Sequence, residues 1–512
     1  MLAASKGNNQ TLVLGLLRAG AEVNARDRST NATPLILASR TGSAAIVEVL
    51  LEFGSNPRRE KTCRGETALL VAAVEGRLDV SRMLVEAGAA PNEAARNGVS
   101  PLCAALEGRN IDMAQLLLRS GADVNFLRPR NGTTPLLVAA HFRTTKIVGP
   151  LLELGADVNF QNPKTGQTAL MIAAYQRDVT LVRLLVDRGA DLELTDEAGY
   201  TALLYASRAG RERAVAVLVE AGADVNVADK TRGRSALLYA ALAGDIGVVK
   251  LLVESGAEVD SPSENRITPL FAASEKGYLD IVRYLIRNGA AVDSRNDNDD
   301  GTPLLIAASN DHTEVVKALV QSGADVNAST DLGFTALAFA VGNGNAEAVQ
   351  FLLKRGAAWS MKDVTDGKDA LWLAALYGHA DIIKLLIQFG AQVDTQDDRG
   401  ALQLHSSFHA SMSFSRVYGA LYGGGGKPLG GGEVVVERRG SSGLHGQWTD
   451  AFNRRSDPGT YSSCEAPSQE RRRSQCSLDA QCHDGSHWSV AEGQCSGGRS
   501  TTGRKGGSRS WR

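Results

Sequence analysis

The residues best suited to hold a metal ion lie near the end of the chain. Four cysteines and two histidines occur there: Cys464, Cys476, Cys482, His483, His487 and Cys495. Thiolates and imidazoles are the ligands that zinc prefers, and structural zinc sites usually take two of them from a Cys-x₂-Cys pair. The cysteines here stand 12, 6 and 13 residues apart and form no such pair. We therefore expect no metal and no other cofactor.

Other patterns that resemble catalytic or ion-binding motifs are incomplete. His141 follows an apolar segment and has the chemistry of a general base, but no nucleophile or orienting group stands near it. The glycine run 423–426 precedes no Lys-Ser or Lys-Thr pair, as a phosphate-binding loop would. The acidic runs 297–301 and 394–400 lack the closing glutamate of a calcium loop. We predict that the chain is not an enzyme and that His141 is a contact residue.

Composition narrows the class of protein further. The 512 residues include 55 basic and 57 acidic side chains, so no overall field favours nucleic acid or an anionic membrane. The sequence has no apolar run long enough for a transmembrane helix and no N-terminal signal peptide, and its six cysteines are too few for a disulfide scaffold. We expect an intracellular, cytoplasmic protein, with the nucleus as the alternative, that neither enters a membrane nor binds a specific nucleic acid.

The elements that position these residues follow an internal repeat. A glycine recurs every 33 or 34 residues, at Gly20, Gly54, Gly88, Gly121, Gly155, Gly189, Gly222, Gly256, Gly289, Gly323, Gly356 and Gly390. A second mark, Thr/Ser-Pro/Ala-Leu, recurs with it, as at Thr134-Pro135-Leu136. Its Pro or Ala stands 20 residues before the next Gly in each full unit, whereas 13 or 14 residues separate that Gly from the next mark. The segment of constant length is predicted to be packed, and the variable segment to be an exposed loop.

The segment of constant length reads as two short helices. Its Thr or Ser can cap the first helix, whose first turn tolerates Pro. Alanine always stands four residues after the Pro or Ala, as at Ala38, and predicts close contact between helices of adjacent units. Leucine always stands four residues before the Gly, as at Leu50, and marks the apolar stripe of the second helix. The Gly fits the left-handed conformation that ends a helix.

These units resemble the ankyrin repeat, whose pattern G-x-T-P-L-x-x-A-A-x-x-G…V-x-x-L-L-x-x-G-A-D-V-N they match in phase. A good copy runs from Gly132 to Asn159. The resemblance covers residues 2–408 and implies an all-α ankyrin-repeat solenoid of about twelve helix–turn–helix units, with finger loops that resemble β-hairpins. The His that usually follows T-P-L is replaced by apolar residues, as at Leu137, and survives at His405.

The array, residues 1–408, lacks a recognisable cap at either end. Leu2-Ala3-Ala4 already corresponds to a first helix, so we expect a fragment, a truncated gene model or a missing preceding repeat. The segment 409–512 is rich in Gly, Ser and Arg and poor in large apolar residues, which predicts a disordered tail. Two interpretations of this tail stay open: a flexible basic arm that touches acidic partners or nucleic acid, and non-native translated sequence.

Two local features modify the regular pattern. Gly149-Pro150 falls inside the second helix of its unit, where Pro removes a backbone hydrogen bond, so we predict a weak point or kink. Asp-Val-Asn precedes the finger in many units and ends at Asn125, Asn159, Asn226 and Asn327. Some ankyrin proteins are hydroxylated on an Asn of this kind, but we interpret the side chain as one that stabilises the turn.

In ankyrin proteins, partners usually lie against the finger loops and the exposed ends of the first helices. By that resemblance, the residues after Ala-Ala in each first helix carry specificity: Arg40, Thr41, Val74, Glu75, His141, Phe142, Tyr175, Gln176, Arg208, Glu275, Lys276, Asn310, Leu376 and Tyr377. These positions vary between units, whereas the Ala and Leu positions do not. Charged finger residues form a second group: Arg58, Arg59, Arg128, Arg130, Arg232, Asp299 and Asp300.

Charge along the fingers changes sign. Further basic residues stand in the early fingers: Lys61, Arg64, Lys230 and Arg234. Further acidic residues stand in the later ones: Asp293, Asp297, Asp331, Asp363, Asp366, Asp397 and Asp398. A bipolar groove would orient an elongated partner and speed its capture. The alternative is that exposed fingers are charged because they are solvated.

The function class that fits these patterns is a protein–protein interaction scaffold or adaptor, which we expect to be monomeric. The alternative is the recognition or regulatory portion of a larger enzyme, a kinase or a ubiquitin ligase, whose catalytic domain lies outside this chain. The repeat by itself does not name the partner.

Overall fold

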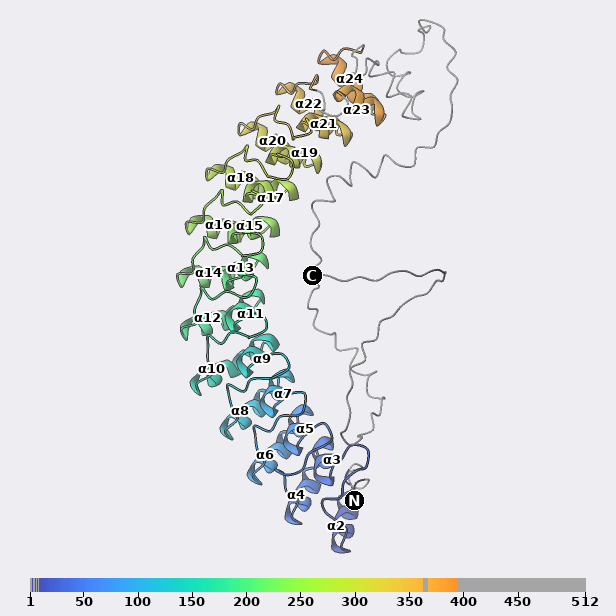
Figure 1. Ribbon diagram of the computed structural model, residues 1–512, viewed down its shortest axis with the longest axis vertical. Helices are drawn as coiled ribbons and strands as arrows, with labels where there is room; N and C mark the ends of the chain where they lie inside the picture. The colour runs from blue at the N-terminus through green and yellow to red at the C-terminus, as the bar shows by residue number, and fades with distance from the viewer. Residues whose placement is uncertain (1, 3–4, 6, 8, 362–366, 394–512) are drawn as a thin grey trace, which may run out of the picture.

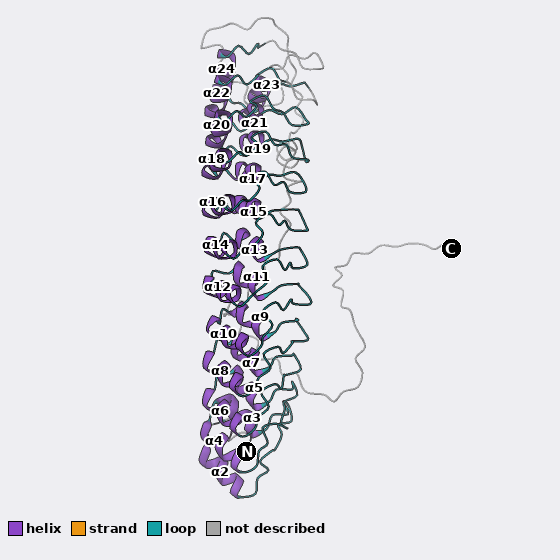
Figure 2. Cartoon of the chain, turned by 90° about the vertical axis from the view of Figure 1, so that its left-hand side faces the viewer, coloured by secondary structure: helices purple, strands orange, loops and turns teal. Residues whose placement is uncertain are grey.

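The helices of the chain stack in two layers that form a long curved array. The computed structural model describes residues 2, 5, 7, 9–361 and 367–393. Within these residues, odd-numbered helices line the concave side and even-numbered helices the convex side (Figure 1). Finger loops project along one edge of the stack (Figure 2). The predicted all-α repeat solenoid is confirmed.

Each full unit contributes one helix to each layer. The concave helices are α3 (Pro34–Thr41), α5 (Ala68–Val74), α7 (Pro101–Glu107), α9 (Pro135–Phe142), α11 (Ala169–Tyr175), α13 (Ala202–Arg208), α15 (Ala236–Ala243), α17 (Pro269–Lys276), α19 (Pro303–Ser309), α21 (Ala336–Gly342) and α23 (Ala370–Leu376). The convex helices are α2 (Gln10–Arg18), α4 (Ala44–Glu52), α6 (Leu78–Glu86), α8 (Ile111–Arg119), α10 (Thr145–Glu153), α12 (Val179–Asp187), α14 (Glu212–Glu220), α16 (Ile246–Glu254), α18 (Leu279–Arg287), α20 (Thr313–Gln321), α22 (Ala346–Lys354) and α24 (Ala380–Gln388). None of the helices described here has the length and apolar character needed to cross a bilayer.

Several sequence predictions fall outside the described residues. They concern Ala3-Ala4 at the start of the first unit, the acidic run 394–400, the tail 409–512 and the cysteine–histidine group within it. The resemblance of the fingers to β-hairpins is limited: the described residues contain isolated β-bridges between Ala228 and Ser235 and between Ser329 and Thr335, and no longer strands.

Local capping explains where the concave helices begin and where the convex helices end. The Thr67 side chain accepts a hydrogen bond of 3.2 Å from the Leu70 N–H and so caps α5. Pro follows the cap in α3, where the first turn needs no N–H partner. At the other end of the unit, Gly54 has a φ of +91° and ends α4 in the left-handed conformation. The predicted caps and terminators are confirmed.

The core is a continuous seam between the two layers. The alanine of every concave helix is buried, and Ala38, Ala139 and Ala273 have no exposed surface. The leucine of every convex helix from α4 to α24 is also buried, as Leu50 and Leu151 show with 0% exposure. Because only a methyl group fits between adjacent concave helices, this position has no freedom to vary. The observed packing therefore explains the constant length of the helical block.

The fingers differ in the size of their turns. In five fingers a backbone N–H bonds the carbonyl five residues on, at 27→32, 128→133, 162→167, 229→234 and 296→301. In five others the bond spans four residues, at 62→66, 95→99, 196→200, 263→267 and 330→334. The extra residue of a long unit therefore enters at the tip of the turn. The finger at 62→66 is the exception, because its extra residue comes before the turn, next to the buried Glu60.

A ladder of backbone hydrogen bonds joins successive fingers. In each bond the N–H of one residue donates to the carbonyl of a residue in the preceding finger. Written as donor→acceptor, the bonds are 63→30, 96→64, 197→165, 230→198, 264→232, 297→265 and 331→299. Pro129 and Pro163 occupy the donor position in the two intervening steps, and proline has no N–H. At the second of these, the Asn162 side chain donates to the Asn131 carbonyl instead, at 3.1 Å.

The Asp-Val-Asn segment works differently from the prediction. The Asp stabilises the turn, since Asp123 Oδ1 accepts from the Asn125 N–H at 2.9 Å. The Asn reaches the next unit, where Asn125 Nδ2 donates to the Gly155 carbonyl at 2.9 Å and Oδ1 accepts from the Asp157 N–H at 3.1 Å. The predicted role of Asn in its own turn is wrong, because its amide bridges two units with both polar atoms.

Helix α10 continues through Pro150 to Glu153 and keeps the nine-residue length of the other convex helices. The helix is therefore not broken at Pro150, but the ring nitrogen cannot donate to the Lys146 carbonyl one turn earlier. Space is not limiting at Gly149, because a Cβ there would have no neighbouring atom within 4 Å. The weak point predicted here amounts to one missing hydrogen bond and one flexible residue.

We expect Pro150→Ala to raise the free energy of unfolding by about 1–3 kcal/mol, because it restores the missing donor. Gly149→Ala is the matched control for helix propensity alone and should add about 1 kcal/mol. Urea unfolding and amide hydrogen exchange within α10 provide the measurement. Unchanged exchange in Pro150→Ala would show that this position is no weak point.

Candidate functional site

The two predicted groups of contact residues lie at opposite ends of the concave helices. Finger residues precede each helix, whereas the variable pairs stand at its last turn, such as Arg40 and Thr41 in α3. A helix of seven residues, such as α5, separates the groups by about 10 Å. A partner that touches both groups must therefore lie across the concave layer.

The structure leaves all the predicted contact residues accessible to some degree. The exposed members are Arg40, Thr41, Arg58, Arg59, Val74, Glu75, Arg130, His141, Tyr175, Lys276, Asp300, Asn310 and Tyr377. The partly buried members are Arg128, Phe142, Gln176, Arg208, Arg232, Glu275, Asp299 and Leu376. Their accessibility permits contact with a partner, and their role in binding stays a prediction.

Ion pairs within the array reduce the charge of the basic fingers. Lys61 Nζ lies 2.5 Å from a Glu93 oxygen in the next finger. Arg128 pairs with Glu107, and its side chain is 13% exposed. Arg58 donates to the Gly88 carbonyl, and Arg59, Arg64 and Arg130 are further exposed cations of this end.

The acidic fingers are also partly neutralised. Arg295 pairs with Asp300, and Arg266 lies 3.9 Å from Asp297. Burial, together with the charges of Asp331 and Asp300, raises the pKa of Asp299 above its usual value, although hydrogen bonds from Asn296 and Gly301 oppose this shift. Four further aspartates of the predicted acidic end, at 363, 366, 397 and 398, lie outside the described residues. Arginines interleaved with the aspartates therefore weaken the charge contrast along the described fingers.

A tyrosine cluster in the middle of the array escaped the sequence analysis. Tyr200 and Tyr239 hydroxyls lie 2.6 Å apart, and Tyr239 donates to Asp229 at 2.9 Å. Tyr205 donates to Asp196 at 2.6 Å and packs against Tyr200 with ring centroids 5.3 Å apart. The sequence does contain an indication of this cluster, because Tyr205 and Tyr239 both follow Ala-Leu-Leu at the same position of adjacent units.

Burial and acidic neighbours keep the cluster in one protonation state. Burial raises the pKa of Tyr205 and of Tyr239, and hydrogen bonds to Asp196 and Asp229 raise both further. Burial alone would raise the pKa of Asp229, but hydrogen bonds from Thr231 and backbone N–H groups hold it below its usual value. The neutral Tyr239 hydroxyl therefore donates to an ionised Asp229 around pH 7, which fixes this finger against the concave helices.

An exposed aromatic and an arginine extend this cluster toward the far end of the concave helices. Tyr175 is 52% exposed and meets the Tyr205 ring edge-on at 6.2 Å. The Arg208 guanidinium lies 5.7 Å from the centre of the Tyr200 ring. Tyrosine and arginine are the residues that most often dominate protein interfaces. Tyr175 therefore presents the accessible part of this cluster, because Tyr200 and Tyr239 are buried.

The buried Glu60 links helix α3 to the finger that carries Arg58 and Arg59. It is 3% exposed, accepts from the Asn56 N–H at 3.1 Å and also accepts from the Thr33 hydroxyl, which caps α3. Burial raises the pKa of this carboxyl above its usual 4.5, although both hydrogen bonds and the charge of Arg26 oppose the shift. The glutamate thus links the start of a concave helix to the finger that presents Arg58 and Arg59.

The raised pKa of Glu60 predicts a pH dependence of stability. The folded chain holds the proton more tightly than the unfolded chain, so stability is greatest below the usual glutamate pKa. The stability then falls as the pH rises through the raised pKa. Glu60→Gln should lack this component when unfolding free energies of the two proteins are compared across pH 4–8. Identical pH profiles for both proteins would contradict the assignment.

Tyr239→Phe should lower the free energy of unfolding by about 1–3 kcal/mol, because it removes the two hydrogen bonds that join the Tyr239 hydroxyl to Tyr200 and to Asp229. Tyr175→Phe is the matched control, since it removes the hydroxyl of an exposed side chain. Urea unfolding of both variants provides the comparison. Equal stability of the two variants would show that the hydroxyl chain contributes nothing.

Comparison with known proteins supports the same repeat. A family model described as ankyrin repeats in three copies matches residues 1–95, 88–162, 145–229, 222–296, 288–363 and 337–410. A B-cell lymphoma 3 protein homolog of Mus musculus is 39% identical over 75 residues, which are 15% of this chain and 17% of that protein. The chain therefore matches that protein over less than a fifth of its length.

Proposed function

The chain belongs to the ankyrin repeat proteins, and we propose that it acts as a scaffold or adaptor that holds partner proteins on its concave face. Ankyrin repeats form protein-interaction modules, and they bind other proteins. The single observation that carries the proposal is the division between invariant and variable positions. The alanine and leucine positions are buried in every full unit, whereas the positions that vary are accessible on fingers and helix ends.

The surface chemistry of the concave face supports binding of an elongated partner segment. The exposed Tyr175, whose ring meets Tyr205 edge-on, offers rigid aromatic surface at low entropic cost. Exposed cations such as Arg59 and Arg130 lie on fingers earlier in the array. A segment that crosses the concave layer can contact both groups of residues at once.

We propose that the chain carries no catalytic centre of its own and needs no cofactor. Ankyrin repeat proteins are commonly intracellular, and we propose the cytoplasm as its compartment, with the nucleus as the alternative. We also propose that the chain acts as a monomer, with its concave face available to partners.

Affinity capture with matched charge reversals tests the proposal. Arg59→Glu reverses a charge on an exposed finger, and Arg82→Glu makes the same change on the exposed face of convex helix α6. We expect Arg59→Glu and Tyr175→Ala to reduce recovery of partners at least about tenfold, as at interface hot spots. Arg82→Glu should recover partners as well as the unaltered chain.

The reverse pattern would refute the concave face as the binding surface. Loss of partners in Arg82→Glu with full recovery in Arg59→Glu and Tyr175→Ala would place binding on the convex helices. Circular dichroism and a urea titration of each variant establish that the array is folded before recoveries are compared.

A further inference from the structure

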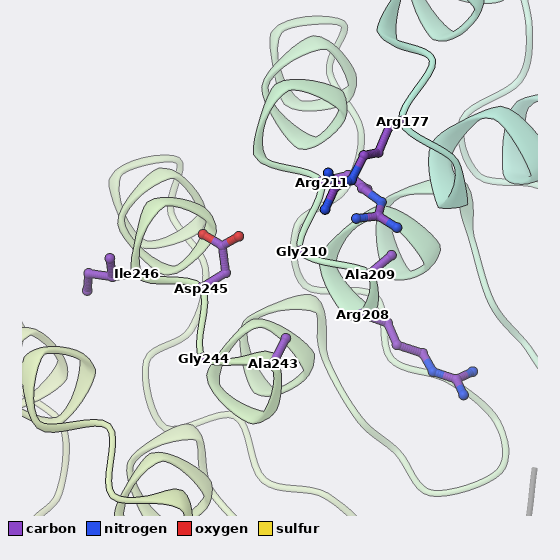
Figure 3. A pocket seen from close by; sticks show the side chains of 9 residues that line it. All are labelled: Arg177, Arg208, Ala209, Gly210, Arg211, Ala243, Gly244, Asp245 and Ile246. Carbon is purple, nitrogen blue, oxygen red and sulfur yellow. The ribbon is translucent and has the colours of Figure 1, made fainter.

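An open hollow lies at the far end of the concave layer, opposite the fingers. Its volume is about 500 Å³, and it is lined by the turn regions that follow helices α11, α13 and α15. Arg177 and Arg211 enter it from two successive units, and Asp245 stands across it (Figure 3). Arg208 also lines the hollow, but its side chain points away from these groups (Figure 3), toward the Tyr200 ring.

Two guanidinium groups converge in the hollow. Arg211 Nε donates to the Tyr175 carbonyl at 3.0 Å, which fixes one side of its guanidinium and leaves the terminal nitrogens available. Burial lowers the pKa of Arg211, and the positive charge of Arg177 lowers it further, so the two cations are close enough to repel each other. Among the described residues, neither arginine forms an ion pair.

Two acidic side chains near the hollow already serve as helix caps. Asp245 Oδ1 accepts from the Gly247 and Val248 N–H groups at 3.0 and 3.1 Å and caps α16. Asp178, which directly follows Arg177, accepts from the Leu181 N–H at 3.1 Å and from the Thr145 hydroxyl at 2.5 Å. These bonds satisfy the two carboxylates locally. The lining holds Arg177, Arg208 and Arg211 against the single acidic Asp245, so the hollow has an excess of positive charge.

We propose that this hollow binds a phosphorylated side chain of a partner protein. A phosphate carries close to two negative charges and three acceptor oxygens, so a single group can accept from both guanidinium groups and relieve their repulsion. A carboxylate carries one charge and two oxygens and compensates one arginine only. Arg211 holds the Tyr175 carbonyl, and the exposed side chain of Tyr175 stands two residues before Arg177, so it offers an apolar surface for partner residues near the phosphate. This inference rests on the proposed function of the concave face and specifies one chemical feature of the partner.

Peptide pools that differ in one central residue test the proposal with the full chain. Degenerate peptides carrying phosphoserine, serine or glutamate at that position are titrated by fluorescence polarisation. We expect the phosphoserine pool to bind at least about tenfold more tightly than either other pool, as charge-assisted pairs allow. Inorganic phosphate should compete with it. The variant Arg177→Gln/Arg211→Gln should bind the phosphoserine pool no better than the serine pool.

A matched control separates this site from charge in general. Arg213→Gln/Arg283→Gln removes two exposed cations from the convex helices α14 and α18 and should retain the phosphoserine preference. Equal binding of the phosphoserine and glutamate pools, or an undiminished preference in Arg177→Gln/Arg211→Gln, would overturn the proposal. Captured partners that still bind this variant would then show that the concave face acts without phosphate recognition, so the two proposals fail separately.

Discussion

The close approach of adjacent concave helices through a single alanine methyl is the constraint on which the array depends. Ala38, Ala139 and Ala273 have no exposed surface, and any larger side chain there would force the units apart. Leucine, valine and isoleucine separate the convex helices, so the concave layer is the thinner of the two and the stack curves toward it. The same spacing brings the fingers close enough for a backbone N–H in one to reach a carbonyl in the previous one.

Regular spacing also explains how specific side chains work across units. Residues that occupy the same register in neighbouring units become neighbours in space, as Tyr205 and Tyr239 do through Tyr200. The Asn bridges follow the same rule, because Asn125 satisfies backbone groups of the unit after its own. The array therefore uses a repeated polar link along the edge and a repeated apolar link in the core, and each unit is stabilised by its neighbours.

Local rules made most of the fold predictable from the sequence. Caps such as Thr67 and terminators such as Gly54 act within one unit, and the constant alanine and leucine positions revealed the buried seam. The site was less predictable, because ion pairs such as Arg128–Glu107 and Arg295–Asp300 depend on side-chain reach between elements. The two missing hydrogen bonds between fingers could not be predicted from the sequence. Pro129 and Pro163 indicate a missing bond only when it is known which N–H of each finger donates to the preceding one.

The central claim about function is that partners bind the variable, accessible positions, which an invariant core holds in place. Hydrogen–deuterium exchange of the full chain, with and without a captured partner, tests it most directly because it reports every backbone segment at once. We expect added protection in the finger loops and in the last turns of the concave helices, with the convex helices unchanged. Protection confined to the convex helices α4 to α24 would contradict it.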